Sequence, residues 1–507
     1  VTNSKTVGVV GAGTMGRGIA QLFAQAGHQV IVYDAQEGAA NAAIEFVVGM
    51  IKRGVEKGRM AADVADSIIS SISSAADLQG LSACDVVVEA IIENIDIKQG
   101  LFLELEKVVS SECILASNTS SLTVSEIAAK CEYPERLAGL HFFNPVPLMK
   151  VAEVIAAVKT SEQTVAALVE LVSGAGHRAV VAADQPGFLV NHAGRGLYTE
   201  GLRIIEEQVA TVEDVDTVMR EAAGFKMGPF ELLDLTGLDV SSKVMTSIYE
   251  QFYQEPRFRP SALIAPRVAA GLFGRKTGEG WYRYEDNKKV ESNKLAAPNL
   301  PKPAADVKVF IDSCADDFLD LTALLASAGV EVIDQAANAD LILVQPWGQD
   351  ASSYAVDNEL DATITVGLDP LPGLDKHRTL MLTSVTTETA RDLAHALLTS
   401  DEVAATVIND SPGFICQRVL ATIVNIATEI AQRGIASVED IEDAVRLGLG
   451  YPMGPLAIGE SIGGDRVLTI LEEILDLSGD PRYRPSRWLA RRVELDVPLT
   501  QAEAARV

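Results

Sequence analysis

The chain has few of the features that mark several protein classes. Its five cysteines are scattered without a C-x-x-C pair, which favours reduced thiols over a disulfide framework or a zinc site. Its apolar runs are short and interrupted, and none approaches a membrane span. The opening VTNSKTVGVVG lacks the charged-then-apolar layout of a secretory signal. The sequence therefore predicts a soluble, cytoplasmic protein with no metal site and no membrane partner.

Basic side chains are also scarce. Lysine and arginine total 42 against 70 aspartates and glutamates, and the net charge is -28. A charge of that sign repels polyanions at long range, so nucleic acid is not an expected partner and any anionic ligand must be held by local donors. The length of 507 residues predicts three or four domains, since a domain usually takes about 100 to 200 residues.

The first segment of the chain has the pattern of a βαβ unit. A β-branched run is followed by GAGTMG (11 to 16), a helix-period stretch, and a second β-branched run that ends at Asp34. In this context the glycines allow a tight turn, a close approach of a pyrophosphate, and helix packing. Asp34 is expected to accept the ribose hydroxyls and to repel a 2′-phosphate, which favours NAD over NADP. The expected cofactor-binding residues of this turn are Gly11, Gly13, Thr14, Met15 and Gly16.

Further apolar runs at 85–91, 114–117 and 137–143 alternate with helical patterns, as expected for a parallel, doubly wound α/β sheet of the Rossmann type. Strand signals fade after Gly187, and residues 188–273 have helical patterns broken at 224–229. A polar, Pro-bearing segment, 284–306, is predicted to be a linker.

An internal repeat defines the rest of the chain. PGFLVN (186 to 191) recurs as PGFICQ (412 to 417), and TVEDVDTVMREAAGFKMGPF (211 to 230) recurs as SVEDIEDAVRLGLGYPMGPL (437 to 456), at one offset of 226. The predicted order is a Rossmann domain (1–186), an all-α domain (187–284), a linker (285–306), a degenerate Rossmann-like domain (307–411) and a second all-α domain (412–507).

The second half has no Gly-rich turn where its sheet begins. The offset places Gly367 at the position of His141, Thr379 at that of Glu153, and Gln417 at that of Asn191. We therefore expect the second half to lack both a cofactor site and an acid-base pair.

Histidine is rare, with six in the chain, and one stands in the segment HFFNPVPLMKVAEVI (141 to 155). His141 precedes an Asn-Pro turn, and Glu153 follows on the next apolar run. A histidine base and a carboxylate that orients it would be a pair of these two residue types. A satisfied structural histidine is the competing interpretation.

Three other segments carry candidate polar residues. SNTSSL (117 to 122) places Asn118 and Ser120 after an apolar strand, where such sheets bind ligands, although helix capping by Ser121 or Thr123 is an alternative. Asn191 follows Pro-Gly-Phe at an expected domain junction. IKRGVEKGR (51 to 59), with Lys52 and Lys57, is either a contact for an anionic substrate tail or a solvated helix face.

Together these motifs resemble the 3-hydroxyacyl-CoA dehydrogenases. The Gly-rich turn, IIENIDIK, SNTSS, HFFNPV, Glu153, QPGFLVN, GFKMGPFELLD and GRKTGEGWY occur in the order typical of that family, over about residues 7–284. The repeated helical domain resembles the long bacterial branch, which includes 3-hydroxybutyryl-CoA dehydrogenases and the 3-hydroxyadipyl-CoA dehydrogenases of phenylacetate breakdown.

The resemblance implies a role for individual residues. His141 matches the catalytic base and Glu153 the acid that orients it, while Ser120 and Asn191 match substrate contacts. The positions that match residues near the nicotinamide and its ribose are Glu93, Lys98, Asn118, Ser120, Asn144 and Lys276. The implied cofactor is NAD and the implied substrate an acyl-CoA. Short members pair through the helical domain, so the two copies here are expected to form a pseudo-dimer within one chain.

Two other functions remain open from the sequence. One is an NAD(H)-binding protein that keeps the fold without turnover, although the retained His141, Glu153 and Asn191 argue against it. The other is a 6-phosphogluconate-type dehydrogenase, which is not expected to carry HFFNPV or GFKMGPF. The acyl-chain preference, the CoA-binding residues and any further oligomerisation do not follow from the residue patterns.

Overall fold

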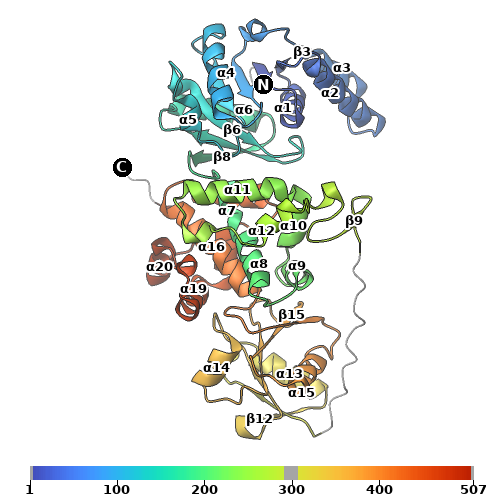
Figure 1. The fold of residues 1–507 in the computed structure, drawn as a ribbon, viewed down its shortest axis with the longest axis vertical. Coiled ribbons are helices and arrows are strands. Elements are labelled where there is room, and N and C mark those ends of the chain that lie inside the picture. Colours follow the sequence, from blue (N-terminus) through green and yellow to red (C-terminus); the bar gives the residue numbers. More distant parts are fainter. Residues whose placement is uncertain (1–3, 291–305, 504–507) are drawn as a thin grey trace. The chain divides into compact units, whose positions relative to one another are not determined.

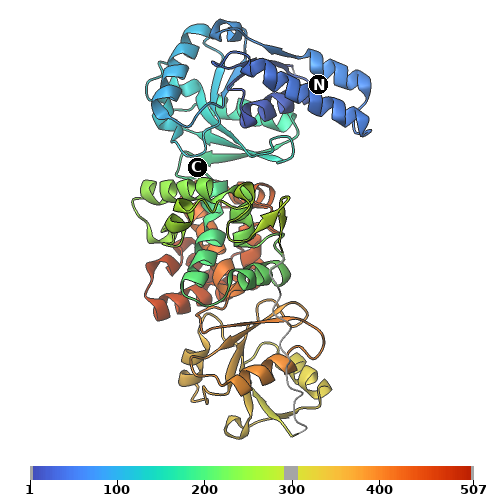
Figure 2. The same ribbon diagram turned by 45° about the vertical axis from the view of Figure 1, so that its right-hand side comes forward.

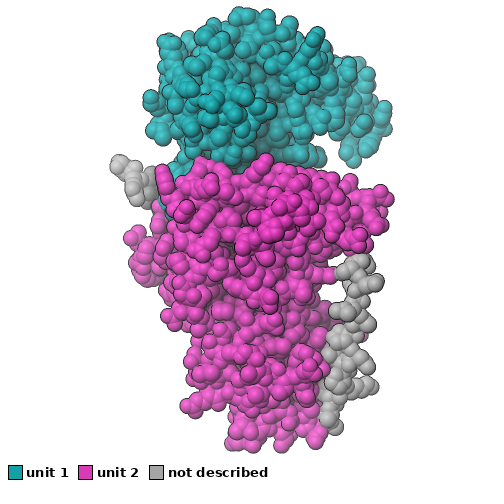
Figure 3. Space-filling view, viewed as in Figure 1, with its two compact units in different colours: residues 1–192, 433–449 teal, residues 193–432, 450–507 magenta. Residues whose placement is uncertain are grey.

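The structure is a computed structural model that describes residues 4–290 and 306–503. It divides into two compact units (Figure 3). Unit 1 comprises residues 1–192 and 433–449, and unit 2 comprises residues 193–432 and 450–507. Among the described residues, no helix has the length and apolar character needed to cross a membrane. All five cysteines are free thiols.

Unit 1 is built on an eight-stranded sheet with the order β3-β2-β1-β4-β5-β6-β7-β8. The strands are β1 (Thr6–Val10), β2 (Gln29–Tyr33), β3 (Ile72–Ser74), β4 (Val86–Glu89), β5 (Ile114–Ser117), β6 (Leu137–Phe142), β7 (Val151–Ala156) and β8 (Arg178–Ala183). All neighbours are parallel except β6 and β7, which are antiparallel. The Rossmann-like sheet is thus confirmed, but the expectation of a wholly parallel sheet is wrong at β7, because the short connection 143–150 leaves no room for a crossover helix.

Helices cover both faces of this sheet (Figures 1 and 2). They are α1 (Thr14–Gln25), α2 (Ala39–Glu56), α3 (Ala62–Ser70), α4 (Ile95–Val108), α5 (Val124–Ala128), α6 (Glu162–Gly174) and α17 (Val438–Gly448), while the short helix α7 (Val190–Ala193) follows β8 and its last residue belongs to unit 2. Alternation along a strand fills a core on each side: Val86 and Val88 pack in one apolar cluster and Val87 in the other. A sheet buried on both faces explains why its strands are almost uniformly apolar.

Helix α17 comes from the far end of the chain and packs on β7 and β8. The N–H of Ala183 donates to the carbonyl of Ile435 at 2.8 Å. The guanidinium of Arg178 donates to Asp443 at 2.8 Å and to Asp440 at 2.9 Å. A segment of the second helical repeat therefore belongs to the same compact unit as the first sheet.

Unit 2 contains both sets of helices and a second sheet. The helices of the first set are α8 (Arg195–Glu206), α9 (Val212–Glu221), α10 (Pro229–Thr236), α11 (Leu238–Gln251) and α12 (Ile264–Ala269), and those of the second are α16 (Cys416–Gln432), α18 (Pro455–Ile462), α19 (Gly464–Ser478) and α20 (Arg487–Glu494). Helix α16 is buried along nearly its whole length. It crosses α8 closely at Gly196, where a Cβ would lie 3.0 Å from the backbone of Ile423.

The second sheet has six strands in the order β12-β11-β13-β14-β15-β16. They are β11 (Lys308–Ile311), β12 (Glu331–Ile333), β13 (Leu341–Val344), β14 (Thr365–Leu368), β15 (Arg378–Leu382) and β16 (Ala405–Ile408), accompanied by α13 (Phe318–Ser327), α14 (Ala351–Asp357) and α15 (Glu388–Leu397). As in the first sheet, one pair near the end, β14 and β15, is antiparallel. Of the predicted linker, residues 291–305 lie outside the described residues, and its first residues form a hairpin of β9 (Tyr284–Glu285) and β10 (Lys288–Lys289).

Candidate active site

The Gly-rich turn lies between β1 and α1. Gly11 has a φ of +105°, and a Cβ there would lie 2.5 Å from the carbonyl oxygen of Ala90. A Cβ on Gly16 would collide with the carbonyl of Gly11, whereas a Cβ on Gly13 would meet nothing within 4 Å. The first and third glycines are therefore required by packing. Gly13 leaves open space at the N-terminus of α1, where Thr14, Met15 and the first N–H groups of the helix are available to an anion.

Asp34 follows β2 and faces this turn. One carboxylate oxygen accepts from the N–H of Ala12 at 2.7 Å, and the other accepts from the N–H of Gln36 at 2.8 Å. The side chain is half-buried, so its remaining lone pairs can accept ribose hydroxyls. The open space at Gly13 and this fixed carboxylate together fit a dinucleotide.

A polar cluster lies at the carboxyl ends of β4 and β5. The Lys98 side chain is 1% exposed, and its Nζ lies 2.6 Å from Glu89 and 3.3 Å from Glu93. One oxygen of Glu93 accepts from Thr119 Oγ1 at 2.6 Å and from the N–H of Ser120 at 3.0 Å. Burial alone would raise the pKa of Glu93, but the Lys98 ammonium and these hydrogen bonds outweigh it and lower that pKa. Glu93 is thus held as a carboxylate that orders the SNTSS segment.

Asn118 connects two strands of the sheet. Its side-chain oxygen accepts from the N–H of Phe142 at 2.8 Å, and its own N–H donates to the carbonyl of Glu89 at 2.8 Å. This fixes the end of β6, where His141 lies. Asn118 therefore acts on the position of His141 through the backbone.

His141 and Glu153 are directly opposite each other on β6 and β7. Their side chains lie on the same face, and His141 Nδ1 is 2.5 Å from Glu153 Oε2. His141 is 5% exposed and Glu153 is fully buried. The imidazole contacts two aromatic rings, Phe143 at 4.6 Å and Phe188 at 5.8 Å between centroids. The pairing depends on the antiparallel strand, since it places the two residues in register.

The second oxygen of Glu153 is held by the backbone that leads into α7. The N–H groups of Leu189 and Val190 both donate to Oε1 at 2.8 Å. A buried carboxylate needs such partners, because an uncompensated charge inside a protein is costly. Both oxygens are therefore occupied, and Oε2 remains as an acceptor for a proton on Nδ1. The unbound nitrogen of the imidazole, Nε2, is left as the base.

The other predicted contacts lie near this pair in sequence and fold. Asn191 is half-buried on α7, directly after the two residues that hold Glu153. Ser120 is half-buried beside Glu93, and Asn144 is exposed in the connection between β6 and β7. Within unit 1 the structure thus gathers these residues on the loops that follow β5 and β6 and on α7.

Three predicted basic residues lie on other elements than these loops and α7. Lys276 belongs to unit 2, where its Nζ forms an ion pair with Asp239. Lys52 and Lys57 lie on an exposed face at the end of α2. No described contact ties either lysine of α2 to the His141 pair, so their role as substrate contacts stays a prediction.

Sequence reasoning missed several residues that organise the site. Glu89 is fully buried and accepts from Lys98 at 2.6 Å, from Ser117 Oγ at 2.6 Å and from the N–H of Ile91 at 2.8 Å. The available signal was the glutamate inside the apolar run DVVVEAI, since a charged side chain within a buried strand requires a partner. The backbone donors of Leu189 and Val190 had no signal, because any residue except proline supplies an N–H.

Comparisons with known proteins show the family to which the chain belongs. A family model described as "3-hydroxyacyl-CoA dehydrogenase, NAD binding domain" matches residues 6–185, and one described as "3-hydroxyacyl-CoA dehydrogenase, C-terminal domain" matches residues 187–284 and again 413–503. The chain is 36% identical over 494 residues to 3-hydroxyadipyl-CoA dehydrogenase of Escherichia coli K12, covering 97% of this chain and 98% of that protein. It is 40% identical over 287 residues to mitochondrial hydroxyacyl-coenzyme A dehydrogenase of Sus scrofa, covering 55% of this chain and 91% of that protein.

Among solved structures, that of 3-hydroxybutyryl-CoA dehydrogenase from Escherichia coli K12 matches with a TM-score of 0.84 and 35% identity, covering 97% of this chain and 99% of that chain. The match therefore extends over both halves of the protein. Because the two family models and a full-length relative agree, this chain belongs to the 3-hydroxyacyl-CoA dehydrogenase family of oxidoreductases, with NAD as its cofactor.

Proposed function

We propose that this protein oxidises (S)-3-hydroxyacyl-CoA to 3-oxoacyl-CoA with NAD, and that His141 is the general base positioned by Glu153. One observation carries the assignment of roles. His141 and Glu153 form a buried pair in which every oxygen of the carboxylate is already committed, one to the imidazole and one to two backbone N–H groups. A purely structural histidine would not require a carboxylate held so firmly.

The reaction removes a hydride from the carbon and a proton from the oxygen of a secondary alcohol. When bound, NAD supplies the hydride acceptor. His141 Nε2 takes the hydroxyl proton, and Glu153 Oε2 keeps the other proton on Nδ1 and stabilises the imidazolium that forms. A positioned base of this kind contributes about 10² to 10⁴ in rate. The rings of Phe143 and Phe188 flank the imidazole and limit access of water to it.

We assign orientation of the substrate to Ser120 and Asn191. Ser120 is fixed through its backbone by Glu93, and Asn191 follows the residues that hold Glu153. Two polar side chains attached to the same supports as the base would keep the hydroxyl and the thioester carbonyl in a reactive position. Alanine at either position is expected to raise KM and lower kcat together, while NADH binding persists in Asn191→Ala.

For the substrate we infer a short-chain or dicarboxylic acyl group, 3-hydroxybutyryl-CoA or 3-hydroxyadipyl-CoA. The support is that proteins matching both halves of this chain bear these two names. Initial rates of NADH formation with a panel of (S)-3-hydroxyacyl-CoAs, including butyryl, longer saturated and adipyl chains, decide between them. A preference for adipyl places the enzyme in phenylacetate breakdown, and a preference for butyryl places it in short-chain metabolism. No turnover on any substrate, with NADH still bound, would contradict the proposed activity.

We further propose that the second half is a degenerate copy of the first, and that the two copies form a pseudo-dimer within one chain. Two hydrogen bonds support this. Ala183 N donates to Ile435 O at 2.8 Å, and Asn409 N donates to Val209 O at 2.9 Å. The two donors differ by 226 (409 − 183) and the two acceptors differ by 226 (435 − 209). Each copy thus gives the same contact to the other, which is the property of a two-fold interface.

The second copy differs where the base would be. The N–H of Asp369 donates to the carbonyl of Thr379 at 3.0 Å. The register of β14 and β15 ends with Leu368 opposite Leu380, and continued by one residue it places Asp369 opposite Thr379. Asp369, and not Gly367 as expected from the offset, therefore takes the place of His141, because the connection between the strands is two residues shorter (379 − 369 against 153 − 141). This pair of an aspartate and a threonine does not provide a histidine base with a carboxylate partner, which supports a structural role for the second half.

Truncation tests the pseudo-dimer. A chain that ends at residue 290 loses α17 from the sheet of unit 1 and the buried helix α16 from unit 2. It is expected to aggregate or to associate with a second copy, as judged by light scattering. A soluble, fully active, monomeric truncation would contradict the proposal.

A further inference from the structure

A small cavity lined by arginines lies in unit 2, among residues that the proposed catalytic mechanism does not use. Its volume is about 210 Å³. Its walls come from α8, from the segment 259–262 and from the turn after α19. The polar residues that line it are Thr199, Arg203, Glu206, Arg259, Ser261 and Arg482. Three arginines and one glutamate thus line the cavity, in a chain whose net charge is strongly negative.

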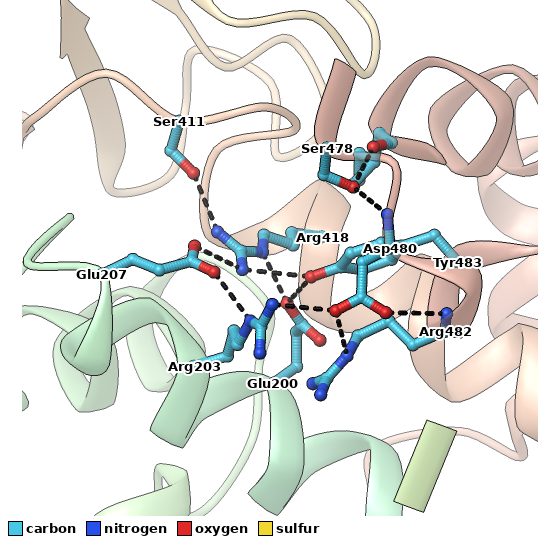
Figure 4. A network of polar contacts seen from close by, with 10 residues as sticks. Glu200, Arg203, Glu207, Ser411, Arg418, Ser478, Asp480, Arg482 and Tyr483 are labelled. Atoms are coloured by element: carbon cyan, nitrogen blue, oxygen red, sulfur yellow. Dashed lines mark hydrogen bonds and ion pairs between the residues drawn. The ribbon is translucent and has the colours of Figure 1, made fainter. Parts of the chain in front are cut away.

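Two of these arginines share a single acidic partner. Arg203 Nη2 lies 2.8 Å from Asp480 Oδ2, and Arg482 Nε lies 3.3 Å from the same oxygen. Figure 4 shows both guanidinium groups linked to this one carboxylate. Arg482 is 4% exposed, and its Nε, although 3.3 Å from Asp480, forms no hydrogen bond within the described part of the chain. Arg203 has a second acidic partner in Glu207, at 2.7 Å, whereas Arg482 forms no ion pair besides that with Asp480 among the described residues.

The internal repeat supplies a comparison within the same molecule. The motif PRFRPS (256 to 261) recurs as PRYRPS (481 to 486), so Arg257 corresponds to Arg482, and on the paired helices Glu429 corresponds to Arg203. At that second place Glu429 Oε2 lies 3.1 Å from Arg257 Nε. An Arg–Glu pair there neutralises itself. At the cavity the glutamate is replaced by Arg203, so Arg482 faces a second cation, and the two guanidinium groups share Asp480.

We propose that this cavity is an oxyanion-binding site that takes one phosphate or carboxylate group between Arg203, Arg259 and Arg482. Guanidinium groups present planar forks of N–H donors that match both kinds of oxyanion. Ser261 adds a donor: its Oγ accepts from the N–H of Leu263 at 3.1 Å, which leaves its own proton for a ligand. Thr199 does not, since its hydroxyl donates to the carbonyl of Arg195 at 2.9 Å. Glu206, which is exposed, stands at the rim.

Binding at this site affects the contact between the two sets of helices. Arg203 Nε lies 2.7 Å from Glu207, and the other oxygen of Glu207 lies 2.8 Å from Arg418 on α16. Arg418 in turn pairs with the buried Glu200 on α8 at 2.5 Å (Figure 4). An anion that relieves the repulsion between Arg203 and Arg482 therefore stabilises the network that joins α8 to α16. The site is predicted to raise the thermal stability of the protein when it is filled.

The test uses the full chain and isothermal titration calorimetry at constant ionic strength, with chloride as the balancing ion. Inorganic phosphate and adipate are titrated separately, in the presence of saturating NADH and CoA so that phosphate does not bind at the dinucleotide turn or at a CoA site. Arg259→Ala removes an exposed lining residue, and Arg203→Glu restores the pairing found in the other copy. Arg391→Ala is the matched control, because Arg391 lies on α15 and pairs with Asp392 at 2.8 Å.

One saturable site per chain is expected for at least one of the two anions. Its affinity should fall about tenfold, or about 1.4 kcal/mol, in Arg259→Ala and Arg203→Glu, and should be unchanged in Arg391→Ala. The unfolding midpoint of the wild type should rise with the anion that binds and should not rise in Arg203→Glu. Binding of phosphate alone identifies a phosphoryl ligand, and binding of adipate alone identifies a carboxylate. Absence of binding by both anions, or equal binding by wild type and both variants, would overturn the proposal, and none of these readouts depends on turnover.

Discussion

Replacing Glu153 with glutamine tests the role of this residue with the smallest change of shape. Glu153 accepts three hydrogen bonds, one from His141 Nδ1 and two from the N–H groups of Leu189 and Val190. Glutamine has one acceptor oxygen and one NH₂ donor. If its NH₂ group faced the two backbone donors, both buried N–H groups would lose their acceptor, at about 1 to 3 kcal/mol each. The oxygen is therefore expected to stay with the backbone.

In that orientation the NH₂ group of the glutamine donates to Nδ1 of His141. The proton of the neutral imidazole then moves to Nε2, which can no longer accept the hydroxyl proton of the substrate. We expect kcat to fall by about 10² to 10⁴, the range for loss of a general base, which corresponds to about 3 to 5 kcal/mol of barrier. NADH binding and the free energy of unfolding should change little, because volume and backbone hydrogen bonds are kept.

The assay compares three quantities in wild type and Glu153→Gln: kcat for NADH formation, the NADH dissociation constant from fluorescence, and the unfolding midpoint in urea. Glu104→Gln is the control, since Glu104 is exposed on α4 and, among the described residues, pairs only with Lys107, at 2.6 Å. Because Glu153 acts through His141, the double variant with His141→Ala should be no slower than His141→Ala alone. Near-normal turnover in Glu153→Gln, or additive losses in the double variant, would refute the reasoning.

Three further predictions concern other parts of the chain. Asp34→Ala should narrow the preference for NAD over NADP, measured as the ratio of kcat/KM values, and unchanged discrimination would remove Asp34 from cofactor selection. Burial raises the pKa of Asp369 to about 7, although hydrogen bonds from Gln417 and from the N–H of Leu371 oppose the shift. The folded state thus favours the protonated carboxyl, and the free energy of unfolding falls as pH rises from about 4 to 7. Asp369→Asn should remove that loss and raise the free energy of unfolding at pH 8 by up to about 4 kcal/mol, with little gain at pH 4, whereas equal urea midpoints at pH 8 would contradict it. Arg418→Met leaves the buried Glu200 uncompensated and should cost about 3 to 5 kcal/mol in urea unfolding, while the double change with Glu200→Leu should recover most of it; a single variant as stable as wild type would show that the pair contributes nothing.

Much of this protein could be predicted from local spacing. The turn GAGTMG lies between a strand and a helix, with Asp34 at the end of the next strand. It indicates a dinucleotide because packing within this short segment requires Gly11 and Gly16, whereas Gly13 leaves open space. The offset of 226 revealed the repeated helical segments, and the family model matches them at 187–284 and 413–503. Such signals are carried by residues close together in the chain, so no knowledge of the packing was needed.

The tertiary structure decided the features that depend on residues far apart in sequence. The antiparallel strand β7 brings Glu153 opposite His141, and the start of α7 supplies the two N–H groups that fix Glu153. A connection shorter by two residues puts Asp369 where the offset predicted Gly367. Helix α17 packs on the first sheet although some 250 residues separate them, and three arginines from α8, from the segment after α11 and from the turn after α19 meet at one cavity. Strand direction, loop length and contacts between distant segments follow from burial of the whole chain, which no short pattern of residues records.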